Sequence, residues 1–105
     1  MVRLPTNRRP TPPGEILLRE FLEPLAISQT AFARRLGITH HRLNEIIRGK
    51  RAISTDTALR LSRVLGTTPD LWLNMQQAID LYDAMHSPTS RDISRLEPLR
   101  QLRSA

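Results

Sequence analysis

Residues 28–51, SQTAFARRLGITHHRLNEIIRGKR, decide the fold of this 105-residue chain. Ser28 is a favoured residue immediately before a helix, because its hydroxyl can accept a hydrogen bond from a free backbone N–H of the first turn. Gly37 is favoured immediately after a helix, where the backbone adopts a positive φ. The sequence therefore predicts a first short helix over residues 29–36.

A second short helix follows almost at once. Thr39 is a suitable cap for a helix over residues 40–48, and Gly49 is a suitable end for it. The two helices are thus joined by a very short turn around Gly37, which forces them to cross steeply. Ala33 is small at the position where the second helix must approach the first most closely.

Apolar and polar residues separate onto opposite faces of this helix pair. The residues expected to face inward are apolar: Phe32, Leu36, Ile38, Leu43 and Ile46. The residues left on the outside of the second helix and at its start all carry hydrogen-bonding groups: Thr39, His40, His41, Arg42, Asn44, Glu45 and Arg48. Such a face suits the base edges and phosphates of nucleic acid.

Further helices are predicted on both sides. The order expected along the chain is a helix that starts near Thr11-Pro12-Pro13 and ends at Pro24, the pair described above, then helices over 54–65 and 70–84. Ser54 or Thr55, and Thr68 followed by Pro69, supply the starts of the last two. One more short helix is possible around Ile93, Leu96 and either Leu99 or Leu102.

No segment alternates apolar and polar residues with a period of two, so strands are not expected. The predicted fold class is therefore all-α, with a five-helix domain over residues 11–86. Residues 1–10, which combine Pro, Asn and Arg with little apolar content, are predicted to be a flexible basic arm. Residues 87–105 are predicted to be a tail that contains at most one short helix.

The charge of the chain is concentrated in the helix pair. The whole chain has 16 Lys and Arg against 10 Asp and Glu, a net charge of +6. Residues 28–51 contain six of these cations and one acid, Glu45, so this segment alone has a net charge of +5. A focused basic patch makes nucleic acid the first partner to consider.

Composition excludes several other classes of protein. The chain has no cysteine, which rules out disulfides, thiolate catalysis and thiolate zinc sites. No apolar run approaches the roughly 18 residues of a membrane span, and the N-terminus lacks an apolar signal core. We therefore expect a cytoplasmic protein without a membrane partner.

The helix pair resembles the helix-turn-helix of phage-repressor-like (Xre-type) DNA-binding proteins at Gln29, Ala33, Gly37, Ile38, Leu43, Ile46 and the Arg48-Gly49-Lys50 exit. A wider set of motifs is similar to HigA-type antitoxins and lies at residues 13–17, 21–25, 42–47, 49–53, 56–61 and 69–74. The resemblance covers roughly residues 12–85. It implies a five-helix phage-repressor-like fold and a homodimer that represses its own operon.

The same resemblance implies a partner protein. The chain would be the antitoxin of a HigB/HigA-like type II toxin–antitoxin system and would bind a small toxin that cleaves mRNA on ribosomes. A stand-alone Xre-type regulator without a toxin is the main alternative. A nuclease is disfavoured because the three His and the scattered carboxylates form no constellation at ligand spacing, and an interaction adaptor is disfavoured by the basic segment.

Candidate base contacts are His40, His41, Asn44 and Glu45 on the second helix. The amide of Asn44 suits adenine and the carboxylate of Glu45 suits cytosine. Asn44 also has a structural share in the family pattern, and Glu45 has the alternative of an intrahelical ion pair with Arg42 or Arg48. A metal site at the two histidines is disfavoured, because adjacent residues on a helix point about 100° apart and no third ligand is nearby.

Candidate phosphate contacts are Gln29, Thr39, Arg42, Arg48, Lys50 and Arg51. Gln29 and Thr39 lie near helix N-termini, where free backbone N–H groups already favour anions, although helix capping is an alternative role for both. No catalytic residue, metal ligand or cofactor is predicted. The expected DNA is a palindromic operator whose two half-sites lie about 34 Å apart, one for each subunit of the dimer.

Large apolar side chains recur along the fifth helix. Trp72, Met75, Ile79 and Tyr82 are predicted to form a dimer or partner surface, because Trp, Tyr and Met are favoured at the centres of interfaces. The alternative is that they pack in the core of one chain.

Overall fold

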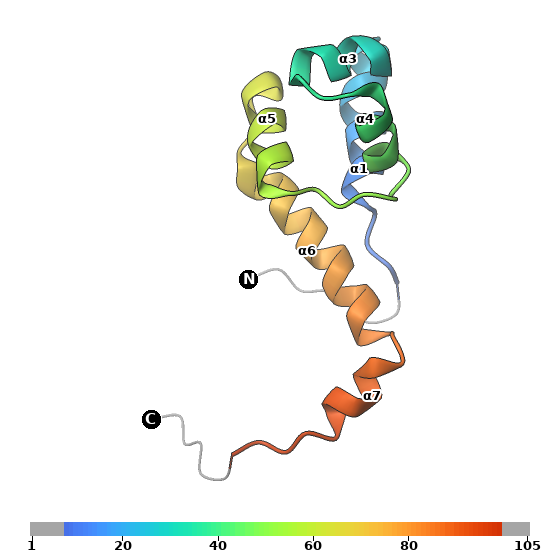
Figure 1. Ribbon diagram of the computed structural model, residues 1–105, viewed down its shortest axis with the longest axis vertical. Coiled ribbons are helices and arrows are strands. Elements are labelled where there is room, and N and C mark those ends of the chain that lie inside the picture. The colour runs from blue at the N-terminus through green and yellow to red at the C-terminus, as the bar shows by residue number, and fades with distance from the viewer. Residues whose placement is uncertain (1–7, 100–105) are drawn as a thin grey trace.

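The computed structural model describes residues 8–99, and this part of the chain contains helices and no strand (Figure 1). The elements in order are α1 (Pro13–Ile16), η1 (Leu17–Leu22), α2 (Glu23–Leu25), α3 (Gln29–Leu36), α4 (His40–Ile47), α5 (Thr55–Leu65), α6 (Pro69–Met85) and α7 (Thr89–Ser94). The predicted all-α class is confirmed. None of the described helices combines the length and the apolarity needed to cross a bilayer.

The first predicted helix is continuous from α1 to α2 but contains a wider turn. Within η1 the backbone forms a π-helical turn, and the N–H of Glu23 bonds to the carbonyl of Leu18, five residues back. In a regular helix the ring of Pro24 would collide with the carbonyl four residues earlier, and the wider turn accommodates it. The prediction that Pro24 ends the helix was wrong by one residue: the helix ends at Leu25, and Ala26, with a φ of 53°, caps it.

The predicted caps are confirmed at four helix starts. Ser28 Oγ accepts from Ala31 N at 3.1 Å, and Thr39 Oγ1 accepts from Arg42 N at 3.0 Å. Ser54 and Thr68 serve α5 and α6 in the same way. These bonds satisfy N–H groups that no helical carbonyl can reach, and they fix where each helix begins.

A single apolar core joins η1, α3, α4, α5 and the start of α6. Its buried residues are Leu17, Leu22, Phe32, Ala33, Leu36, Leu43, Ile46, Ile53, Ala58, Leu61 and Trp72. Trp72 lies at the start of α6, packs against the ring of Phe21 with centroids 5.5 Å apart, and donates its indole N–H to Thr67 Oγ1 at 2.8 Å. The inward residues predicted for the helix pair all belong to this core or pack against it.

Gly14 lets α1 approach α4 at backbone distance. It is buried, and a Cβ built on it would overlap the carbonyl oxygen of Ile46. Because any side chain would push the two helices apart, this glycine helps to set the position of α4. The sequence reasoning placed Gly14 in a family motif but gave it no physical role.

The molecule divides into two regions, which we call the head and the stem. The head (13–75) is the compact group of α1 to α5 with the first turns of α6, and the stem (76–94) is the rest of α6 with α7 (Figure 1). A last short helix is present, but at Thr89–Ser94, so of the residues predicted to form it only Ile93 is helical. Leu96 and Leu99 follow it without helical structure, and Leu102 lies outside the described residues.

The described end of the predicted N-terminal arm contacts the stem. Arg9 donates from Nε and Nη2 to the two carboxylate oxygens of Asp83, at 2.8 and 2.9 Å. This pairing lowers the pKa of Asp83, chiefly through the hydrogen bonds from Arg9. Residues 1–7 lie outside the described range, so the predicted flexibility of the arm is not addressed for them.

Candidate nucleic-acid interface

Helix α4 presents its polar side outward. Leu43 and Ile46 are buried in the core, whereas His40 and His41 at the start of the helix are exposed. The cap at Thr39 fixes where the first turn begins and therefore which way these two side chains point. The predicted arrangement, with a polar face available to a ligand, is thus present in the structure.

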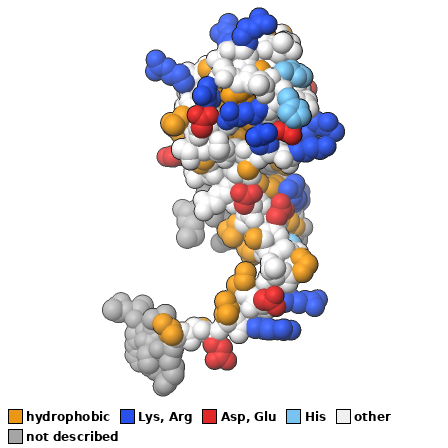
Figure 2. All heavy atoms as spheres, in the orientation of Figure 1, with side chains coloured by type: hydrophobic (Ala, Val, Ile, Leu, Met, Phe, Trp, Pro, Cys, Tyr) orange, Lys and Arg blue, Asp and Glu red, His pale blue; other side chains and the backbone are white. Residues whose placement is uncertain are grey.

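Cations surround this face. Arg48, Lys50 and Arg51 follow α4 directly and are exposed, and Arg34 and Arg35 are exposed on α3. Figure 2 shows His side chains beside Lys and Arg side chains on the head, whereas apolar side chains gather along the stem. The surface around α4 therefore attracts polyanions.

Two of the predicted contacts bind each other. Asn44 Nδ2 donates to Gln29 Oε1 at 3.1 Å, which ties α4 to the first residue of α3. Both side chains are half-buried. This bond is consistent with the structural share expected for Asn44, and it leaves the amide nitrogen of Gln29 and the carbonyl oxygen of Asn44 available to another partner.

Glu45 is engaged by two neighbours. Its carboxylate accepts hydrogen bonds from Arg51 at 2.6 and 2.9 Å and lies 3.3 Å from His41 Nε2. The hydrogen bonds from Arg51 are the main cause of a lowered pKa for Glu45. The predicted alternative was an intrahelical ion pair of Glu45 with Arg42 or Arg48. Glu45 does form ion pairs, but its partners are Arg51 and His41.

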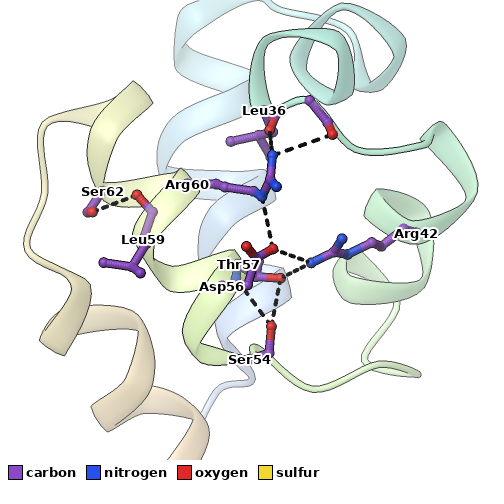
Figure 3. A network of polar contacts seen from close by, with 9 residues as sticks. Leu36, Arg42, Ser54, Asp56, Thr57, Leu59, Arg60 and Ser62 are labelled. Carbon is purple, nitrogen blue, oxygen red and sulfur yellow. Dashed lines mark hydrogen bonds and ion pairs between the residues drawn. The ribbon is translucent and has the colours of Figure 1, made fainter.

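Arg42 points toward α5, where it meets Asp56 and Thr57 (Figure 3). Its Nη2 donates to Asp56 Oδ2 at 3.0 Å and to Thr57 Oγ1 at 2.8 Å. Only 29% of its side chain is exposed. Arg42 was predicted to contact phosphate, and the structure gives it internal partners that compete with that role.

Arg60 on α5 completes this network (Figure 3). Its Nε donates to Asp56 Oδ2 at 2.8 Å, and its Nη1 donates to the carbonyl of Leu36 at 2.9 Å, where α3 ends. The hydrogen bonds from Arg60 and then Arg42 lower the pKa of Asp56. The sequence reasoning missed Asp56 and Arg60 as site residues, although their spacing of four residues is typical of a helical ion pair.

The predicted dimer or partner surface needs correction. Trp72 and Ile79 are buried within the chain, so a partner cannot reach them, and Met75 packs against the core. Tyr82 remains partly accessible and stacks on His86 with ring centroids 4.0 Å apart. The apolar spacing in this helix reports mainly the core, which was the stated alternative.

Within residues 8–99 no group of three His, Asp or Glu residues is arranged to hold a metal ion. The two histidines of α4 differ in their surroundings, since His41 lies beside Glu45 and His40 is exposed at the first helical position. This surface therefore offers hydrogen-bonding and cationic groups that can bind a ligand.

Known proteins share this chain's sequence and fold. Residues 18–72 match the family described as "Helix-turn-helix". An uncharacterized HTH-type transcriptional regulator of Escherichia coli, YbaQ, is 37% identical over 96 residues, which is 90% of this chain and 85% of that protein. Antitoxin HigA-1 of Vibrio cholerae is 41% identical over 78 residues, 74% of this chain and 73% of that protein.

A solved structure extends the comparison to three dimensions. The Pseudomonas aeruginosa antitoxin HigA, determined with the higBA promoter, superposes with a TM-score of 0.81 at 40% identity. The match covers 87% of this chain and 99% of that one. The similarity therefore extends well beyond the helix pair.

Proposed function

The chain belongs to the helix-turn-helix family, in a branch that includes HigA antitoxins, and from this premise we propose that it is a sequence-specific DNA-binding repressor. It acts as the antitoxin of a HigB/HigA-like toxin–antitoxin system and represses its own operon. The observation that carries the proposal is the outward polar face of α4, surrounded by exposed cations on a buried apolar mount. This is a family of DNA-binding regulators rather than of enzymes.

Base reading falls to the outer side of α4. His40 and His41 offer ring nitrogens at the end of the helix that enters the major groove. Asn44 offers its side-chain oxygen Oδ1, which the hydrogen bond from Asn44 Nδ2 to Gln29 leaves free. Glu45 offers Oε2, because both hydrogen bonds from Arg51 go to Oε1 and its other partner, His41 Nε2, lies 3.3 Å from Oε2.

Phosphate binding falls to the edges of the same surface. Gln29 and Thr39 lie at the N-termini of α3 and α4, where backbone N–H groups favour anions. Arg48, Lys50 and Arg51 supply charge beyond the end of α4. Each lost phosphate contact should reduce the slope of log K against log salt by roughly 0.9.

The stem supplies the surface for a homodimer. Leu81, Met85 and Ile93 are 46%, 56% and 61% exposed on the single chain, and such large apolar side chains favour burial against a second copy. A twofold dimer would present two α4 helices to half-sites about 34 Å apart, which matches a palindromic operator. The site of action is the cytoplasm, where the chromosome is.

Binding to the DNA upstream of its own gene tests the repressor proposal. Fluorescence anisotropy would compare a duplex of roughly 30 base pairs from that region with a scrambled duplex of equal composition, at several salt concentrations. We expect specific binding that is at least about a thousandfold tighter than binding to the scrambled duplex. Equal affinity for the two duplexes would contradict sequence-specific recognition.

Co-expression tests the toxin partner. The small open reading frame adjacent to this gene should arrest growth when expressed alone, and this chain should restore growth and co-purify with the product. If neither rescue nor co-purification occurs while the DNA is still bound, the protein is a stand-alone regulator, which the similarity to a transcriptional regulator also accommodates.

A further inference from the structure

One side of α5 reaches both helices of the helix-turn-helix (Figure 3). Arg60 bonds to the carbonyl of Leu36 at the end of α3, and Arg42 extends from α4 to Asp56 and Thr57. Asp56 lies between the two arginines, with a single oxygen, Oδ2, accepting from both. The crossing of α3 and α4 is thus tied by charged groups to a third helix.

Thr57 gives this network a buried anchor. Thr57 is buried, with 2% of its surface exposed, and its hydroxyl oxygen accepts from Arg42 at 2.8 Å and from Ser54 Oγ at 3.1 Å. Removing a charged donor from a buried oxygen costs free energy, because water does not replace that donor. Moving Arg42 outward to a phosphate therefore breaks two hydrogen bonds and leaves Asp56 with Arg60 as its remaining ion-pair partner.

We propose that Arg42 and Asp56 are positioning residues that hold α4 at the correct angle for the groove, and that Arg42 does not neutralise a DNA phosphate. The carboxylate of Asp56 takes the place of the phosphate as the counter-ion of Arg42. The inference rests on the proposed function, because it concerns how the same surface reads DNA. Arg42 thus has a different role from the exposed cations Arg48, Lys50 and Arg51.

The two roles leave different signatures in binding data. A cation that neutralises phosphate releases counterions, so its loss changes the salt slope and weakens all sequences about equally. A residue that only orients α4 affects the fit to base edges, so its loss lowers the ratio of operator to scrambled affinity and leaves the slope unchanged. Arg42→Gln should show the second signature and Arg48→Gln the first.

The experiment measures both affinities against salt for wild type, Arg42→Gln, Asp56→Asn and the double variant, with Arg48→Gln as the phosphate control. Removing any acid strengthens attraction to all DNA, so Asp70→Asn, which also lies in the first turn of a helix, controls for the charge of Asp56. We expect Arg42→Gln and Asp56→Asn each to lower the affinity ratio at least tenfold. The double variant should lose no more than either single variant.

Several results would overturn the inference. A slope that falls by roughly 0.9 in Arg42→Gln would place Arg42 on a phosphate. An unchanged affinity ratio in Asp56→Asn, or additive losses in the double variant, would show that the pair does not act as a unit. If wild type itself does not distinguish the duplexes, the proposed function fails instead.

Thr57→Val keeps the test decisive if Arg42→Gln does not fold, which a thermal melt would reveal. This change preserves size and charge and removes the oxygen that anchors Arg42. We expect a lower affinity ratio with an unchanged slope. A Thr57→Val protein with the wild-type ratio would contradict the anchor.

Discussion

The head and the stem differ in how far their large apolar side chains are buried. In the head, apolar residues such as Phe32 and Leu43 are buried, and the exposed positions around α4 are largely cationic. In the stem, large apolar residues such as Leu81 and Met85 stay exposed, and the neighbouring charges include both signs. The head encloses the apolar core and exposes few large apolar residues beside it (Leu25, Leu59 and Leu71), whereas large apolar residues recur on the surface of the stem.

This difference teaches which part of the chain carries which role. A buried core gives α4 a rigid mount, and rigidity is what a site that must match base edges requires. Apolar surface that one chain leaves exposed is typical of an interface between chains. We therefore expect recognition to depend on the head and assembly to depend on the stem.

The largest effect is expected from emptying the core of the head. Trp72→Ala removes a fully buried ring together with its hydrogen bond to Thr67, which should lower the free energy of unfolding by roughly 3–5 kcal/mol. Chemical denaturation would measure the loss. Tyr82→Ala in the stem is the control and should cost much less. Equal losses of stability would mean that the start of α6 contributes no more to the core than its C-terminal half.

A charge in the stem should break assembly and spare the fold. Leu81→Asp should weaken self-association by about 1.5–3 kcal/mol, roughly tenfold to a hundredfold, because the apolar side chain is no longer buried against the second copy. Sedimentation over a range of concentrations would measure it. Leu25→Asp, at an exposed apolar position in the head, is the matched control. If only the control dissociates the protein, the dimer surface lies in the head.

A methyl group at Gly14 should disturb the mount of α4. Gly14→Ala places a Cβ against the carbonyl of Ile46, and the required shift of α1 from α4 should cost roughly 1–3 kcal/mol of stability. Thermal melts would detect it. Gly49→Ala serves for comparison: its Cβ meets no atom within 4 Å, although its φ of +74° adds some strain. A larger loss at Gly49 would argue against close helix contact as the reason for Gly14.

The smallest effect is expected where the arm meets the stem. Because Arg9 lowers the pKa of Asp83 in the folded protein, this ion pair adds stability above the ordinary pKa of an aspartate. The contribution is lost as pH falls through the lowered pKa. The difference in melting temperature between wild type and Asp83→Asn should therefore be small at pH 7 and vanish in acid. Arg9→Gln should follow the same curve, and a gap that widens in acid would contradict the pairing.

Much of the head could be predicted because local chemistry decides it. Ser28, Thr39 and Gly37 act through bonds to their own neighbours, so their effect is visible in the sequence. The apolar spacing of Leu43 and Ile46 likewise predicts which side of α4 is buried. From these residues alone the helix pair and its outward polar face followed.

The missed features depend on contacts between distant segments. Arg42 bonds to residues 14 and 15 positions later, and no pattern within α4 reveals that its guanidinium leaves the DNA-facing side. The π-helical turn before Pro24 depends on how a whole helix adjusts to one ring. Tryptophan is a residue type favoured at interfaces, but Trp72 is buried in the core. Only its packing in the folded chain distinguishes these two roles.

Glu45 draws the chain beyond α4 back onto that helix, because its backbone carbonyl accepts from Lys50 and Arg51 N and its carboxylate accepts from Arg51 Nη2. The groups proposed to read sequence and those proposed to hold the strand are therefore parts of one rigid piece. A substitution of Glu45 would free the guanidinium of Arg51 but would keep the two hydrogen bonds to the backbone carbonyl, which do not depend on the side chain. In evolution, a change of target sequence made through Glu45 would therefore alter how Arg51 is held and would leave the course of the backbone after α4 intact.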